Sequence, residues 1–68
     1  MGNLRLEDIY GRIRGCRSRL NDPHPPKEAV ASQYRDDYGS DIEADIKAAS
    51  PDDRFAVMRA LALCGVRL

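Results

Sequence analysis

The chain begins with a stripe of apolar residues at helical spacing. Between residues 4 and 20, the intervals between apolar positions alternate between three and four residues, which is typical of one face of an α-helix. The stripe consists of Leu6, Ile9, Ile13, Cys16 and Leu20. We therefore predict a first helix over residues 4–20 whose apolar face packs against the rest of the protein.

A proline-rich linker over residues 21–26 separates this helix from the next one. Each proline pushes the preceding residue out of the helical region, so the first helix ends before the linker. A second helix is predicted from about Pro26 to Asp37, and Gly39 provides its stop signal. Its inward face consists of Val30, Tyr34 and Tyr38, which are four residues apart.

A third helix is predicted to begin after Ser40. Ser40 is a typical N-cap residue, and Glu43 lies three residues later, so the pair forms the pattern of a capping box. Acidic side chains in the first turn also interact favourably with the helix dipole. The inward face of this helix consists of Ile42, Ile46 and Ala49.

The fourth segment is apolar on nearly all sides. Ser50 and Pro51 predict a helix start, and Gly65 predicts its end, so we expect a helix over residues 51–64. Its apolar residues are Phe55, Val57, Met58, Leu61 and Leu63. A helix that is apolar all round is typically buried, so we place this one at the centre of the core. The predicted fold is a single all-α domain of four short helices spanning residues 1–68.

Length and composition agree with one small globular domain. The chain has 68 residues, of which 43% are hydrophobic and 32% are charged. The longest apolar stretch, residues 55–66, is interrupted by Arg59 and is too short to cross a bilayer. Charged residues within the first eight positions also argue against a signal peptide. We therefore expect a cytoplasmic protein with no membrane partner.

The net charge is zero, but the charges are segregated along the chain. Residues 1–20 carry five arginines against two acids, and residues 21–53 carry three basic side chains against nine acids. Residues 54–68 add three arginines. This basic, acidic, basic order favours charge pairing within the chain or between subunits, and it argues against a uniformly cationic nucleic-acid binder.

The arginines of the first helix are the strongest candidates for a functional surface. Arginine can pair with carboxylates in bidentate geometry, neutralise phosphates, or keep a helix face solvated. The acidity of residues 36–53 favours carboxylate pairing. We predict a small non-enzymatic protein-interaction or regulatory module, binding a protein partner or a second copy. The alternative is a nucleic-acid-binding protein that uses the same residues. The candidate partner-binding residues are Arg5, Arg12, Arg14, Arg17 and Arg19.

No residue pattern indicates catalysis, a cofactor or a metal site. His24 has no cysteine or acid at motif spacing, and two cysteines with one histidine do not form a zinc pattern. Cys16 and Cys64 are expected to be buried and reduced. The acids between Asp36 and Asp45 lack the central glycine and terminal glutamate of a helix–loop–helix calcium site.

Residues 29–63 contain a series of motifs that lie in the last three predicted helices. Tyr34 precedes an aromatic–glycine step at residues 38–39, and two further motifs follow. The first comprises Asp41, Ile42, Asp45 and Ile46, and the second comprises Phe55, Met58, Ala60 and Leu61. This series resembles the second half of an annexin repeat, and the resemblance implies a helical packing scheme.

The calcium-binding part of the annexin pattern is absent from this chain. Annexins carry a Gly-x-Gly-Thr loop between their first two helices, where this chain has Asn-Asp-Pro-His-Pro-Pro. The position of the distal acid is occupied by Ala49 or Ser50, and one of the five helices is missing. We therefore expect no calcium-dependent membrane binding, and a membrane adaptor is the weakest of the functional hypotheses.

Overall fold

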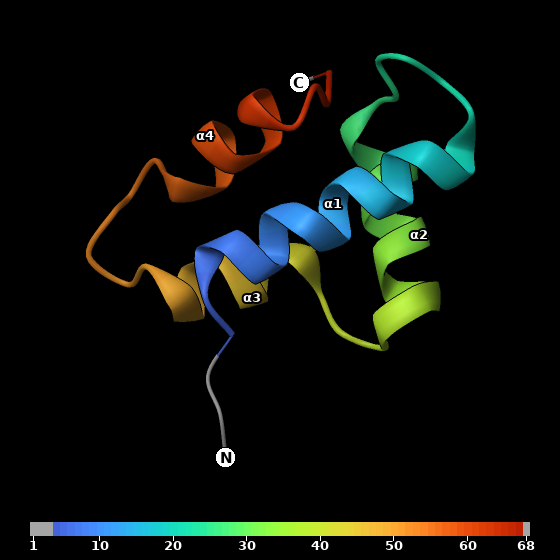
Figure 1. The fold of residues 1–68 in the computed structure, drawn as a ribbon. Helices are drawn as coiled ribbons and strands as arrows, with labels where there is room; N and C mark the ends of the chain where they lie inside the picture. Colours follow the sequence, from blue (N-terminus) through green and yellow to red (C-terminus); the bar gives the residue numbers. More distant parts are fainter. Residues whose placement is uncertain (1–3, 68) are drawn as a thin grey trace.

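The computed structural model describes residues 4–67, which form a small all-α domain of four helices (Figure 1). The predicted fold class is confirmed. Within residues 4–67 no strand is present, and each helix boundary that was predicted lies within five residues of the observed one. The helices are α1 Leu6–Leu20, α2 Lys27–Tyr38, α3 Ile42–Ala49 and α4 Ala56–Leu63.

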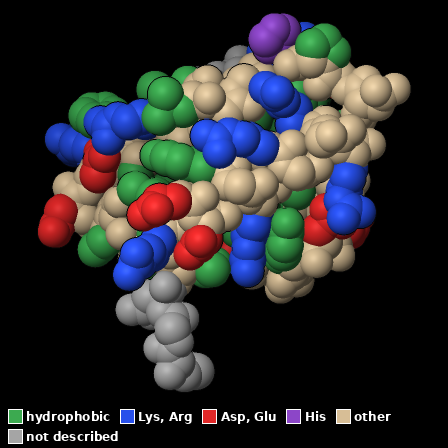
Figure 2. All heavy atoms as spheres, viewed as in Figure 1, with side chains coloured by type: hydrophobic (Ala, Val, Ile, Leu, Met, Phe, Trp, Pro, Cys, Tyr) green, Lys and Arg blue, Asp and Glu red, His purple; other side chains and the backbone are tan. Residues whose placement is uncertain are grey.

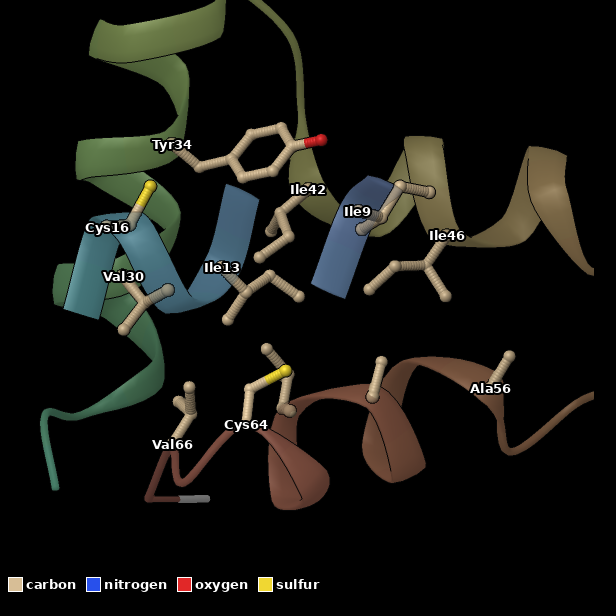
Figure 3. Close-up of a cluster of buried hydrophobic side chains, with 12 residues drawn as sticks. Ile9, Ile13, Cys16, Val30, Tyr34, Ile42, Ile46, Ala56, Cys64 and Val66 are labelled. Carbon is tan, nitrogen blue, oxygen red and sulfur yellow. The ribbon is translucent and has the colours of Figure 1, made fainter. Parts of the chain in front are cut away.

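The core gathers apolar side chains from all four helices into one cluster (Figure 3). The predicted inward residues of α1, α2 and α3 supply most of it, but Tyr38, which was predicted to face inward, is 42% exposed and lies outside the core. The core consists of Ile9, Ile13, Cys16, Val30, Tyr34, Ile42, Ile46, Ala56, Ala60, Leu61, Cys64 and Val66.

The central position predicted for the fourth helix is wrong. α1 packs against both α2 and α3, whereas α4 packs mainly against α3. Leu61 is buried, but Phe55 and Met58 are each 57% exposed and Leu63 is 63% exposed. The physical reason is coverage: in so short a chain, the other three helices cover only one side of α4. Its second apolar side therefore faces solvent.

The start of α3 differs from the predicted capping box. The N-cap is Asp41, whose carboxylate accepts a hydrogen bond from the backbone N–H of Ala44 at 3.2 Å. Aspartate caps a helix as effectively as serine. The hydroxyl of Ser40 instead donates to the carboxylate of Asp45 at 3.0 Å. Ser40 is therefore committed to a side-chain contact rather than to capping.

α4 begins at Ala56 rather than at Pro51. Successive turns occupy residues 50–55, with backbone hydrogen bonds of 3.2 Å from Asp53 to Ser50 and from Ala56 to Asp53. The Asp53 carboxylate also accepts a hydrogen bond from the N–H of Phe55 at 3.0 Å. Such local side-chain bonds compete with helix formation, so the predicted first turn of this helix does not form.

The C-terminal end of the described chain is fastened to the proline-rich linker. Gly65 ends α4 with a φ of +77°, in the left-handed region that glycine adopts readily. Arg67 then pairs with the linker: its N–H donates to the carbonyl of Pro25 at 2.9 Å, and its carbonyl accepts from Lys27 at 3.1 Å. This contact holds the end of α4 beside the start of α2.

Candidate functional site

Arg12 points into a contact with α2 and α3 rather than into solvent. Its guanidinium carbon lies 4.3 Å from the centre of the Tyr38 ring, which is a close cation–π geometry. One guanidinium nitrogen lies 3.4 Å from the Tyr34 hydroxyl and 3.8 Å from the Asp45 carboxylate. Arg12 therefore meets the acidic segment within the same chain.

Asp45 joins Arg12, Tyr34 and Ser40 in one polar cluster. Its carboxylate accepts a hydrogen bond of 2.7 Å from the buried Tyr34 hydroxyl and one of 3.0 Å from Ser40. Burial, together with the hydrogen bond to Asp45, raises the pKa of Tyr34 to about 12. The cluster links α1, α2 and α3, and its geometry is that of a structural contact.

Arg17 and Arg19 also make contacts within the chain. The Arg17 guanidinium donates to the carbonyl of Cys64 at 2.9 Å, so it supplies a partner for the C-terminal end of α4. Arg19 lies 3.3 Å from the Asp37 carboxylate, with its side chain 67% exposed. An ion pair this exposed contributes only about 0–1 kcal/mol to stability.

Arg5 and Arg14 occupy different positions from the other three arginines. Within residues 4–67, neither guanidinium forms an ion pair, and both residues are exposed. The backbone N–H of Arg5 is bound by the Asp8 carboxylate at 3.3 Å at the start of α1. The structure thus divides the predicted partner-binding set into three residues with internal contacts and two that project into solvent.

The two cysteines are free and buried, as the sequence analysis predicted. The Cys16 thiol donates to the Asp37 carboxylate at 3.7 Å, and burial followed by that carboxylate raises its pKa to about 11. Burial also raises the pKa of Cys64. Because the thiolate is the reactive form, neither side chain has the properties of a nucleophile at neutral pH.

The acidic residues that invite a calcium interpretation are distributed among structural contacts. Asp41 caps α3, Asp45 binds Tyr34, and Asp37 accepts hydrogen bonds from Gln33 and Cys16. Among residues 4–67 there is no group of three His, Cys, Asp or Glu side chains that could hold a metal ion.

His24 lies in the linker beside the end of α4. Its Nδ1 is 3.3 Å from the carbonyl of Gly65, and its backbone N–H is bound by the Asp22 carboxylate at 3.0 Å. Together with Ala62, Val66 and Arg67, it borders an open hollow of about 640 Å³. The contacts of His24 thus join the linker to the loop after α4.

The side of α4 that faces away from the core presents apolar side chains to solvent. Phe55, Met58, Ala62 and Leu63 are exposed, and we call these four residues the α4 surface. Figure 2 shows hydrophobic side chains at the molecular surface over α4, with Lys and Arg side chains among them. The sequence analysis named three of these residues but assigned them to the core, because their pattern alone does not distinguish a covered face from an open one.

A groove lies beside the α4 surface, where α4 meets α3 and the first residue of α2. Its volume is about 410 Å³, which is within the range of ligand-binding clefts. The floor is apolar, and the rim carries three basic residues and one acid. The lining consists of Val57, Met58, Leu61, Lys27, Glu43, Lys47 and Arg54. We call this feature the α4 groove.

None of the helices within residues 4–67 has the length and apolar character that a bilayer crossing requires. Comparison of the chain with protein-family models, with curated proteins and with solved structures finds no match. The annexin resemblance therefore stays a prediction from the sequence.

Proposed function

We propose that this chain is a non-enzymatic protein-interaction module that binds its partner through the α4 surface. The observation that carries the proposal is the exposure of Met58 and Leu63 on one short helix and of Phe55 at its N-cap. Exposed apolar side chains grouped on a small domain mark interaction sites more often than single ones do, and Arg59, with its side chain 56% exposed, lies among these three.

Burial of this surface would contribute to the driving force for association. Complete burial of one large apolar side chain contributes about 1.5–3 kcal/mol. Phe55, Met58 and Leu63 each leave more than half of the side chain exposed. Covering all three would therefore contribute on the order of 3–5 kcal/mol before the cost of association is subtracted.

The arginines of α1 have a narrower role in this proposal than the sequence analysis gave them. Arg12 and Arg17 are held by contacts within the chain, so recruiting them to a partner would break those contacts. Arg5 and Arg14 project into solvent, and neither belongs to the α4 surface or lines the α4 groove. A cytosolic location is part of the proposal, and the two free thiols support a reducing compartment.

Site-specific photo-crosslinking tests the proposal. A benzophenone amino acid is placed at Leu63 on the α4 surface or, as a control, at the exposed Ser32 on α2. Each variant is then expressed in cells of the organism that encodes the protein. We expect a discrete adduct from position 63 that is absent from position 32. The adduct should also disappear when Phe55→Ser is added, with helicity by circular dichroism unchanged. Equal adduct patterns from both positions, or none from position 63, would refute the proposal.

A further inference from the structure

The α4 groove combines an apolar floor with an unbalanced positive rim. Lys27 and Glu43 form an ion pair of 3.1 Å across it, so the single acid is already partnered. Lys47 and Arg54 make no ion pair within residues 4–67. Two positive charges therefore remain unpaired at the rim of the α4 groove, above its apolar floor.

The α4 groove lies between two helices. It is bordered by α3 and α4, and Met58 belongs both to its floor and to the α4 surface, so the two features adjoin and form one apolar strip. Amphipathic helices dock into such grooves through side chains at positions i, i+3, i+4 and i+7. Polar residues that flank these anchors then face the rim.

The charge of the rim argues against a second copy as the occupant. A two-fold symmetric dimer places the same patch against itself, so the basic rim of one copy would face the basic rim of the other. Like charges brought together across an interface are unfavourable, whereas acidic groups would be attracted to both side chains. Phosphate groups would satisfy the rim but would leave the apolar floor exposed.

Building on the proposed function, we propose that the α4 groove binds an acidic amphipathic helix of a partner protein. The apolar anchors of that helix cover Val57, Met58 and Leu61, and its flanking Asp or Glu side chains pair with Lys47 and Arg54. The apolar floor of the groove contributes binding free energy, and its basic rim favours acidic partners over basic ones.

Two designed peptides test this inference. Both are helical, about four turns long, and carry leucine anchors on one face. One has glutamate at every flanking position, and its twin has lysine. Binding of each labelled peptide to the full chain is followed by fluorescence anisotropy at low and at physiological salt. We expect the acidic peptide to bind roughly tenfold more tightly than its twin, and the preference to shrink with salt.

Charge reversal with a matched control locates the effect. The variant Lys47→Glu with Arg54→Glu should abolish or invert the preference, and Met58→Ser should weaken both peptides together. The control, Arg5→Glu with Arg14→Glu, changes the net charge equally but lies on α1. It should retain most of the preference for the acidic peptide.

The possible failures are distinguishable. Equal affinity for the two peptides, no binding of either, or an equal loss in the α1 control would overturn the inference. A dimer by ultracentrifugation that Met58→Ser dissociates would overturn it as well, because a second copy would then occupy the strip. Each of these peptide outcomes leaves the crosslink from position 63 as an independent measure of the proposed function.

Discussion

Replacing Tyr34 with phenylalanine isolates the contribution of one buried hydroxyl. The Tyr34 side chain is fully buried, and its hydroxyl donates to Asp45 at 2.7 Å while accepting from Arg12 at 3.4 Å. Phenylalanine keeps the ring and therefore the packing of the core. What is lost is a hydrogen bond to a charged group, which is worth about 1.5–3 kcal/mol.

A loss of this size is large for so small a domain. Domains of this length seldom have more than about 3–5 kcal/mol of net stability from their core. A cost of about 2 kcal/mol corresponds to a decrease in Tm of roughly 8–16 °C for a domain of 60–100 residues. We expect Tyr34→Phe to remain folded at low temperature and to melt well before the wild type.

The cost of Tyr34→Phe should also depend on pH. The folded protein raises the pKa of Tyr34 from its ordinary value of 10.0 to about 12, so folding favours the protonated hydroxyl. The stabilisation from this group is therefore complete below pH 10 and is lost as the pH rises towards 12. The difference in unfolding free energy between wild type and variant should shrink over that window.

Urea denaturation followed by circular dichroism measures both effects. Tyr38→Phe serves as the matched control, because it removes the same atom from a residue that is 42% exposed and preserves the ring beneath Arg12. Two results would refute the reasoning: a Tyr34→Phe cost below about 0.5 kcal/mol, the usual range for surface substitutions, or an equal cost for Tyr38→Phe.

Three further predictions concern the glycines and a thiol. Gly11→Ala and Gly15→Ala should each raise the unfolding free energy by up to about 1 kcal/mol, because both glycines are helical and an added Cβ meets no atom within 4 Å; a lower Tm for either would contradict this. Gly65→Ala should cost more than Gly39→Ala in urea denaturation. Both positions have positive φ, but only at Gly65 would a Cβ collide with the guanidinium that binds the end of α4. Cys16 should react with Ellman's reagent at pH 8 only as fast as the protein unfolds, because burial and Asp37 raise its pKa to about 11; rapid reaction of the native protein would show that the thiol is accessible.

Much of the fold could be predicted because its signals are local. The apolar stripe of α1 forms at a spacing of three and four residues, so Ile9 and Ile13 share a face in any helix that contains them. Gly39 and Gly65 end their helices because a left-handed residue costs glycine little. The predicted helix starts were less accurate, because more than one nearby side chain could cap each helix. Asp41 caps α3 in place of Ser40, and Asp53 binds the backbone N–H of Phe55 in the segment where Ser50 was expected to start a helix.

The candidate site depended on relations that no local pattern contains. The sequence determined that α4 is apolar on nearly all sides, but whether Met58 lies in a core or at a surface depends on how many helices surround it. Likewise, the sequence determined that α1 carries five arginines and that the middle of the chain is acidic. Only the packing of α1 against α2 and α3 decided that Arg12 meets Asp45, 33 positions away, while Arg14 faces solvent. Charge and apolarity are properties of residues, whereas exposure is a property of the assembled helices.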